Sequence, residues 1–476
     1  MTDPPAMVTL ELTVPVEDIA ALRRRLAPGL GRARALTMEW HDDGEGTLAQ
    51  RGAALVCWRA GRASFWRLEA LDPQAPPGAP APVMAEAAIQ EGLRHAGLPE
   101  GMAAVQHFAG RVREGLAAGV ALRLLEGRLG DGAPVARLAL AGPADEVAAL
   151  GLGLAGSLCL AVPGRSLAAE ALARAGVAVA PRRLGAPQLQ SDLAPGEAFA
   201  QAAGHLLGVL LHHAPAAAAG QTGEPVHQMR VALRRLRALV SVFRPVVACP
   251  ELDAARPALK ALASALGPAR DWDVFLDGTG RRVAAAFADE PGVAVLLAAA
   301  EAQRAAAYAA LATQLAGPEL RSLSVQTALL VLARPWEGLA QEAPADTGAF
   351  GAAVLGKRLR RLVRHAGKID TQPEAALHEL RLKAKRLRYA AEVFAPLSPG
   401  REAPRFLRRL AALQEALGHL NDGAVAVGLM QALAAEGGTG LAGGLVRGFV
   451  AGQAGETRDG IARAWKRLRK ARVFWH

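Results

Sequence analysis

Two stretches of the chain carry the same pattern of histidine and basic residues. Residues 226–237 read VHQMRVALRRLR and residues 377–388 read LHELRLKAKRLR. On a helix, the basic residues of each stretch fall on one stripe and the apolar residues on the opposite side. The two stripes are His227, Arg230, Arg234 and Arg237, and His378, Arg381, Lys385 and Arg388. Neighbours at these spacings project side chains about 5–6 Å apart, which suits the binding of an extended anion.

A plain solvent-exposed face is the other interpretation of such a stripe. Exposed helix faces usually mix charges, because opposite charges at i,i+4 attract and like charges repel by a few tenths of a kcal/mol. These stripes contain basic residues and no acid. A repulsive pattern that occurs twice favours an anionic partner over a solvated surface.

The two stretches belong to a longer internal repeat. His227 and His378 are 151 positions apart, and the same offset relates ALGPARD at 265–271 to ALGHLND at 416–422. Phe243 and Pro245 also match Phe394 and Pro396 at this offset. A constant shift over so many positions predicts a duplicated structural unit.

These motifs resemble those of the CHAD family, which is named for histidines within an α-helical domain. The resemblance covers about residues 195–476 and rests on two full copies of the motif, each with its RRLR or KRLR run and its ALG tail. It implies an all-α domain of two four-helix bundles related by a pseudo-twofold axis. It also implies that inorganic polyphosphate binds in a basic groove between the bundles.

Further residues extend the predicted site. Lys260 in PALKALASALG matches a basic position of the family, and residues 349–365 form a predicted helix with Lys357, Arg361 and Arg364 on one stripe. For the two histidines, contact with phosphate and a structural role both stay open. Glu224 and Glu379 lie close enough in sequence to be their partners.

The charge of the chain is unevenly distributed. Residues 195–476 hold 36 Lys plus Arg and 24 Asp plus Glu, whereas residues 1–194 hold 19 and 20. Such a basic half favours nucleic acid, an anionic membrane surface or a phosphate polymer as partner. Nucleic-acid binding usually recruits aromatic residues for base stacking, but only 4% of the chain is aromatic and the stripes contain none. We therefore expect polyphosphate as partner, and neither a specific nucleic acid nor a membrane.

Targeting and cofactor signals are sparse. The N-terminus MTDPPAMVTLELTVP does not read as a signal peptide, and the apolar run at 148–162 is too short for a membrane span. The three cysteines have no metal-binding spacing. We expect a cytoplasmic protein located at polyphosphate granules, with no metal and no cofactor.

The first part of the sequence predicts an α+β domain. Strand patterns occur at 8–14, 53–59, 64–70, 119–125 and 134–141, and helices are expected at 17–27 and near 166–175. This order favours an antiparallel sheet or barrel with a few helices. We expect this domain at 1–184, a linker at 185–196, and the helical domain at 197–476, with repeats at about 197–340 and 348–476.

The α+β layout resembles the CYTH family, the triphosphate tunnel fold, in a degenerate form. The family's opening Glu-x-Glu-x-Lys corresponds to Thr9, Glu11 and Thr13, and its Arg-x-Arg falls at Val56 and Trp58. Its later acidic strand falls at 137–142, which contains no acid, and its Ser-Lys pair is Ser166 and Leu167. Two-metal phosphoryl chemistry needs several carboxylates. We therefore expect a non-catalytic protein. A Mg²⁺-dependent inorganic triphosphatase and a non-specific nucleic-acid binder are the alternatives.

Overall fold

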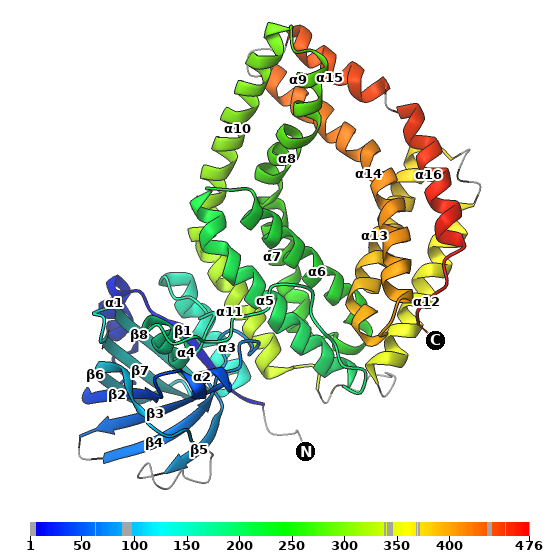
Figure 1. The fold of residues 1–476 in the computed structure, drawn as a ribbon. Helices are drawn as coiled ribbons and strands as arrows, with labels where there is room; N and C mark the ends of the chain where they lie inside the picture. Colours follow the sequence, from blue (N-terminus) through cyan, green and yellow to red (C-terminus); the bar gives the residue numbers. More distant parts are fainter. Residues whose placement is uncertain are drawn as a thin grey trace.

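The computed structural model describes residues 6–61, 63–87, 98–337, 339, 346–367, 369, 372–435, 440–452 and 454–475. The side chains of residues 374, 418–424, 434–435 and 454–458 are not described. The described chain has two parts, a sheet with short helices followed by an all-helical part (Figure 1).

The N-terminal part is built on an eight-stranded antiparallel sheet in the order β1-β8-β7-β6-β2-β3-β4-β5. Its strands are β1 Met7–Thr13, β2 Arg34–Asp42, β3 Ala53–Ala60, β4 Ala63–Ala70, β5 Val83–Ala87, β6 Ala103–Ala117, β7 Val120–Leu129 and β8 Pro134–Pro143. Its helices are α1 Ile19–Leu26, α2 Thr47–Gln50, α3 Ala144–Ser157 and α4 Leu167–Arg174. The predicted α+β fold is confirmed, and β1 and β5 form the two edges of the described sheet.

Strand alternation gives the sheet two different faces. In β1, the buried Val8, Leu10 and Leu12 point to one face, where α3 and α11 cover the sheet. Glu11 and its neighbours in alternation point to the opposite face. That second face packs against α4, with Trp40 among its buried residues.

The C-terminal part is helical, as predicted. Its elements are α5 Pro195–Ala219, α6 Glu224–Val247, α7 Pro250–Ala265, α8 Gly267–Phe275, a π-helical turn at Leu276–Gly280, α9 Arg281–Ala286, α10 Pro291–Ala316, α11 Pro318–Ala333, α12 Thr347–Ala366, α13 Glu374–Phe394, α14 Glu402–Ala435, α15 Gly440–Gly452 and α16 Ala454–Arg469. In the described residues, no helix combines the length and apolar character needed to cross a membrane.

The 151-residue offset relates the helices of the two copies. It pairs α5 with α12, α6 with α13, α7 plus α8 with α14, and α10 with α15 plus α16. The first copy breaks between α7 and α8, where Pro268 follows Gly267, whereas α14 continues through the equivalent His419. Proline lacks a backbone donor and ends or begins a helix, which explains this difference.

Four phenylalanines pack where the two copies meet. Phe199 and Phe350 are equivalent at the offset of 151, as are Phe243 and Phe394. The ring of Phe243 lies 5.0 Å from that of Phe350 and 5.7 Å from that of Phe394, between centroids. These rings belong to one apolar core that runs through both copies. The repeats therefore fold as a single helical body.

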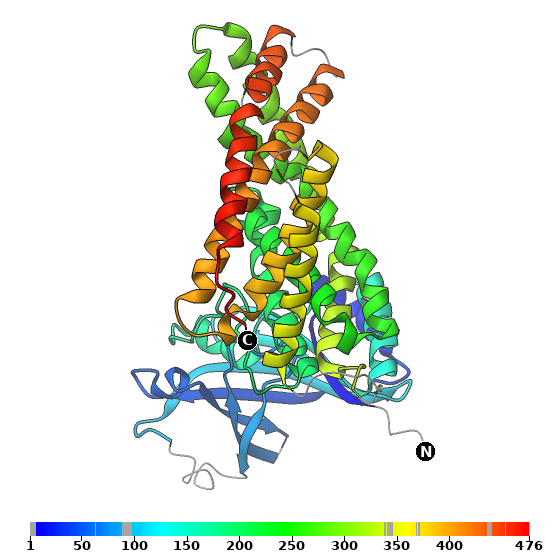
Figure 2. The ribbon, with the colours of Figure 1, turned by 90° about the vertical axis from the view of Figure 1, so that its right-hand side faces the viewer.

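The two parts of the chain pack through an apolar interface. Leu207 of α5 and Val325 and Leu329 of α11 belong to the same buried cluster as the β1 side chains. The buried His205 adds polar contacts, 3.1 Å from the Gln74 side-chain oxygen and 3.1 Å from the Gly185 carbonyl oxygen. Figure 2 shows the sheet lying across the lower ends of the helices.

Candidate anion-binding site

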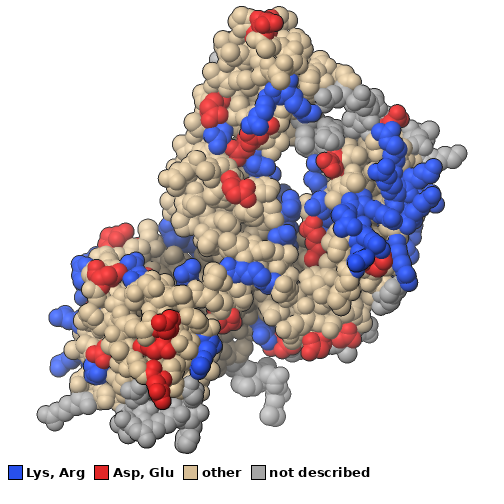
Figure 3. Space-filling model, viewed as in Figure 1, with Lys and Arg blue, Asp and Glu red and all other residues tan. Residues whose placement is uncertain are grey.

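A cavity of about 360 Å³ lies between the two copies of the repeat. Its walls come from α6, α8, the π-helical turn, α13 and α14. Its charged and histidine lining residues are His227, Arg230, Arg234, Arg270, Asp271, Arg381 and Lys385. Figure 3 shows an opening through the helical part with Lys and Arg side chains on its margins. Five cations and one carboxylate give the cavity an excess of positive charge.

The inner cations of the two predicted stripes line this cavity together. Arg230 and Arg381 are equivalent at the offset of 151, and so are Arg234 and Lys385. All four lie on the polar sides of α6 and α13, opposite buried residues such as Leu233. The repeat thus places two matched pairs of cations around one volume.

Arg270 is a cavity residue that the sequence analysis did not select. Its guanidinium lies 4.0 Å from the carboxylate of the buried Asp273, which also accepts hydrogen bonds from Arg304 Nε at 2.7 Å and from Tyr308 Oη at 2.9 Å. This network ties α8 to α10. A Cβ on Gly223 would come 2.8 Å from the Asp273 carboxylate, so the glycine lets α6 begin close to α8. The repeated ALGPARD motif ends in Arg270 and Asp271, so the repeat could have identified Arg270 from the sequence.

Burial changes the proton affinity of the cavity groups. Desolvation lowers the pKa of His227, and the nearby charges of Arg270, Arg234 and Arg230 lower it further against the opposing effect of Glu224. These effects favour the neutral imidazole. Arg230 also has a lowered pKa from desolvation, partly offset by Asp271.

The residues at the far end of each stripe differ from the inner four. Arg237 is exposed and does not line the cavity. Its equivalent Arg388 donates to Glu392 Oε1 at 2.7 Å and to Gln414 Oε1 at 2.8 Å. The guanidinium of Arg234 lies 4.9 Å from the centre of the Tyr389 ring, in cation–π contact. The structure thus brings the inner cations together and leaves Arg237 and Arg388 outside the cavity.

The second histidine is placed differently from the first. His378 is exposed and does not line the cavity, whereas His227 does. Glu379 pairs with Lys383 at 3.0 Å, and Glu224 accepts a hydrogen bond from Gln228 at 2.5 Å. Glu224 also acts electrostatically on His227.

The other predicted site residues lie on the surface. Lys260 on α7 and Lys357, Arg361 and Arg364 on α12 are exposed and do not line the cavity. A separate hollow of about 380 Å³ is lined by an outer arginine cluster on α14 and α16, which consists of Arg405, Arg408, Arg409 and Arg467. Figure 3 shows a dense patch of basic side chains on the side of the molecule where these helices run.

On the sheet face covered by α4, charged side chains interact with other groups of the protein. Arg137 donates to Thr13 Oγ1 at 2.9 Å and pairs with Glu170 of α4. Burial raises the pKa of Glu11, against the opposing charges of Arg137 and Arg123. Ser166 caps α4 by accepting from the Ala169 amide at 3.3 Å.

The carboxylates on this face do not suit a metal. Positions Thr9 and Thr13 beside Glu11 bring no acid, and a carboxyl with a raised pKa is a weak ligand for a hard cation. Among the residues that the structure describes, no three His, Cys, Asp or Glu side chains are grouped to hold a metal ion.

Comparisons with known proteins identify the family of the helical part. The model of the CHAD domain family matches residues 201–431. The crystal structure of the CHAD domain from the plant Ricinus communis is 30% identical, with a TM-score of 0.55, and the match covers 62% of this chain and 98% of that one. This chain belongs to the CHAD family.

Two further solved structures are similar to parts of this CHAD protein. PptA from Streptomyces chartreusis is 16% identical with a TM-score of 0.43, and the match covers 58% of this chain and 98% of that one. A proposed adenylyl cyclase from Hippeastrum, described as having a dominant triphosphatase activity, is 15% identical with a TM-score of 0.31. That match covers 36% of this chain and 97% of the Hippeastrum chain. The search of curated proteins finds no match to this sequence.

Proposed function

We propose that this protein binds inorganic polyphosphate in the cavity between the two helical copies. The observation that carries this proposal is the convergence of Arg230, Arg234, Arg381 and Lys385 on one volume, joined by Arg270. Polyphosphate carries about one charge per phosphoryl unit and has neither bases nor sugars. A row of cations with short spacing matches such a ligand, and binding releases its counterions.

The proposed site relies on guanidinium and ammonium groups that face the cavity. Arginine can hold two phosphoryl oxygens at once through its planar fork, and lysine acts as a point charge. Arg388, with its bond to Glu392, supports its helix, and we assign it no contact with ligand. The exposed Arg237, Lys260, Lys357, Arg361, Arg364 and His378 form a secondary set that a long polymer meets outside the cavity.

We propose capture without catalysis, in the cytoplasm at polyphosphate granules. The CYTH-like face of the sheet offers Glu11 with a raised pKa and an arginine already paired with Glu170. Those groups lack the set of carboxylates that two-metal phosphoryl transfer requires. We therefore expect no Mg²⁺-dependent phosphate release from triphosphate, measured at varied Mg²⁺.

Calorimetric titration of the full chain with long-chain polyphosphate tests the proposal. The variant Arg230→Glu/Arg381→Glu should lose binding, because it turns one matched pair of cavity cations into acids. The control Arg24→Glu/Arg25→Glu makes the same change of charge at two exposed residues of α1, and should bind normally. Unchanged binding by the cavity variant, with an unchanged circular dichroism spectrum, would refute the site.

Competition with duplex DNA separates this function from non-specific nucleic-acid binding. Both ligands are offered at equal phosphate concentration and moderate salt, since salt weakens both. Polyphosphate should remain bound. Displacement by DNA would favour a general polyanion binder.

A further inference from the structure

A second basic groove, of about 460 Å³, lies where the sheet part meets the helical part. Its walls come from the loop at 161–165, from Arg182, and from α5, α10 and α11. None of the described residues that line it is acidic. Its volume falls within the range of about 300–1,000 Å³ that is usual for small-molecule sites.

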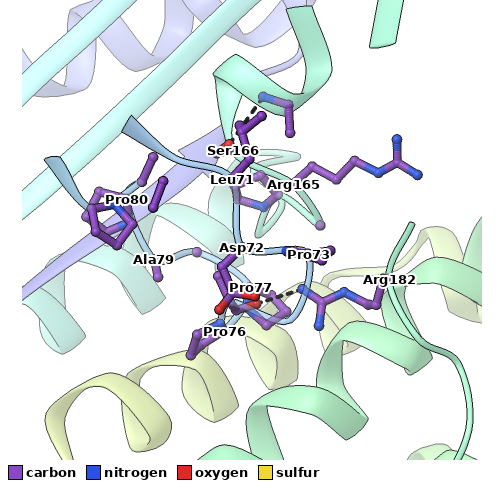
Figure 4. A pocket seen from close by; sticks show the side chains of 18 of the residues that line it. Leu71, Asp72, Pro73, Pro76, Pro77, Ala79, Pro80, Arg165, Ser166 and Arg182 are labelled. Atoms are coloured by element: carbon purple, nitrogen blue, oxygen red, sulfur yellow. Dashed lines mark hydrogen bonds between the residues drawn. The ribbon is translucent and has the colours of Figure 1, made fainter. Parts of the chain in front are cut away.

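Three arginines converge on this groove from separate segments. Arg165 and Arg182 come from the end of the N-terminal part and Arg321 from α11. Burial lowers the pKa of Arg182, and the charge of Arg165 lowers it further, while Asp72 opposes both. Figure 4 shows Arg182 reaching the proline-rich loop, where its Nη2 donates to the Ala75 carbonyl at 2.7 Å.

Two of these guanidinium groups keep N–H groups without an acceptor. Arg182 Nη1 and Arg321 Nε are buried and have no hydrogen-bond partner within the described structure. A Cβ on Gly208 would come 2.4 Å from Arg182 Nη1, so this glycine of α5 lets the guanidinium approach the helix. Burying a donor without an acceptor is unfavourable. The described residues of the protein therefore do not satisfy all the donors of these two arginines.

The groove also has an apolar lining. Leu211, Leu315 and Leu320 line it, from α5, α10 and α11. A phosphate polymer has nothing to place against such a surface, whereas a ligand with an apolar body gains from burial there. The groove thus differs in chemistry from the central cavity.

We propose that this groove binds a small amphipathic anion. Arg165, Arg182 and Arg321 hold its phosphate or carboxylate, and the leucines contact its apolar body. Because the groove is formed by both parts of the chain, its ligand bridges them. This proposal is independent of polyphosphate binding in the central cavity.

Calorimetric titration of the full chain with decyl phosphate, below its micelle concentration, tests the groove. We expect saturable one-to-one binding. Inorganic phosphate supplies only the anionic head and decanol only the apolar body, and each should bind at least tenfold more weakly. No saturable binding of decyl phosphate, or equal binding of inorganic phosphate, would overturn the proposal.

Variants locate the binding. Arg165→Gln/Arg321→Gln should weaken decyl phosphate binding at least tenfold, and Ala316→Trp should block it by filling the groove. Arg183→Gln is the matched control, since Arg183 adjoins Arg182 without lining the groove. Arg230→Glu/Arg381→Glu should bind decyl phosphate normally. Equal affinity in the groove variants and the control would place the ligand elsewhere.

Vesicles distinguish a free ligand from a lipid headgroup. Phosphatidic acid in phosphatidylcholine vesicles presents the same phosphate with its apolar body held in the bilayer. We expect the protein to bind decyl phosphate and not to sediment with these vesicles. Sedimentation with vesicles that is lost in Arg165→Gln/Arg321→Gln would overturn the assignment to a free ligand and place a membrane surface on the groove.

Discussion

The helical cavity and the sheet face covered by α4 both contain arginines, but the surroundings of these arginines differ. In the cavity, five cations face one carboxylate. On the sheet, Arg137 is bound by Thr13 and Glu170, and an apolar cluster that includes Trp40 lies on the same face. Charge that a protein neutralises itself stabilises its fold. An excess of cations around one cavity, in contrast, suits an anionic ligand.

The largest expected effect comes from removing the second matched pair of cavity cations. Arg234→Gln/Lys385→Gln should weaken polyphosphate binding about 100-fold, at roughly 1.4 kcal/mol for each lost charged contact. Arg137→Gln should leave binding unchanged and destabilise the N-terminal part by about 1–2 kcal/mol, because it removes the charged contact to Glu170, which keeps only Arg174 at 3.7 Å. Calorimetry and thermal unfolding measure the two effects. A loss of polyphosphate binding in Arg137→Gln would show that the sheet face also contributes to binding.

A smaller loss is expected when Arg270 is neutralised. Arg270→Gln removes one cavity cation outside the matched pairs and should weaken binding about tenfold, or 1.4 kcal/mol. Arg281→Gln is the control, because Arg281 is exposed and paired with Asp277 at 3.0 Å. Equal affinities of the two variants would remove Arg270 from the site.

The sheet part should respond to pH through Glu69. Burial raises the pKa of Glu69 to about 7, above the ordinary value, with Arg67 opposing and Glu11 adding to the rise. The folded state then binds a proton more tightly than the unfolded state. Its contribution to stability is full below about pH 4.5 and is lost as pH rises to about 7.

The variant Glu69→Gln isolates this effect. It should be more stable than the parent by about 3 kcal/mol at pH 8, and the difference should shrink toward pH 5. Thermal unfolding across this range measures it, with Glu45→Gln, at an exposed residue of the same part of the chain, as control. A difference that does not vary with pH would show that folding does not raise the pKa of Glu69.

The smallest expected effect belongs to His227. Its pKa is lowered in the empty cavity, and a bound polyanion favours the charged imidazolium, so binding takes up a proton. Affinity for long-chain polyphosphate should rise about threefold from pH 8 to pH 6, or roughly 0.6 kcal/mol. His227→Gln should abolish this rise and His378→Gln should keep it. Equal pH profiles for both variants would exclude ligand contact by His227.

Much of this fold follows from local patterns in the sequence. The strands at 53–59, 64–70 and 134–141 were predicted because apolar residues dominate or alternate there, and β3, β4 and β8 confirm them. β2, β5 and β6 were not predicted. In β6, Arg111 and Arg113 lie on one face and Glu114 on the other, with glycines and alanines among them, which obscures the alternation. Pairing with β2 and β7 supplies the stabilisation that local composition does not reveal.

The candidate site was predicted only in part. Helical periodicity identified the polar sides of α6 and α13, and the repeat offset identified equivalent positions. Periodicity does not say where along a helix the partner element lies. It could not separate the inner Arg230 and Arg381 from Arg388, which is held by Glu392 of the same helix and Gln414 of α14. Arg270 lies on a short helix whose orientation depends on the tertiary contacts of Asp273.

A structure of the full chain crystallised with a short polyphosphate gives the most direct test. The account predicts phosphoryl groups between α6 and α13, in contact with Arg230, Arg234, Arg381 and Lys385. Ligand density confined to the outer arginine cluster at Arg408 and Arg409, with the central cavity empty, would contradict it.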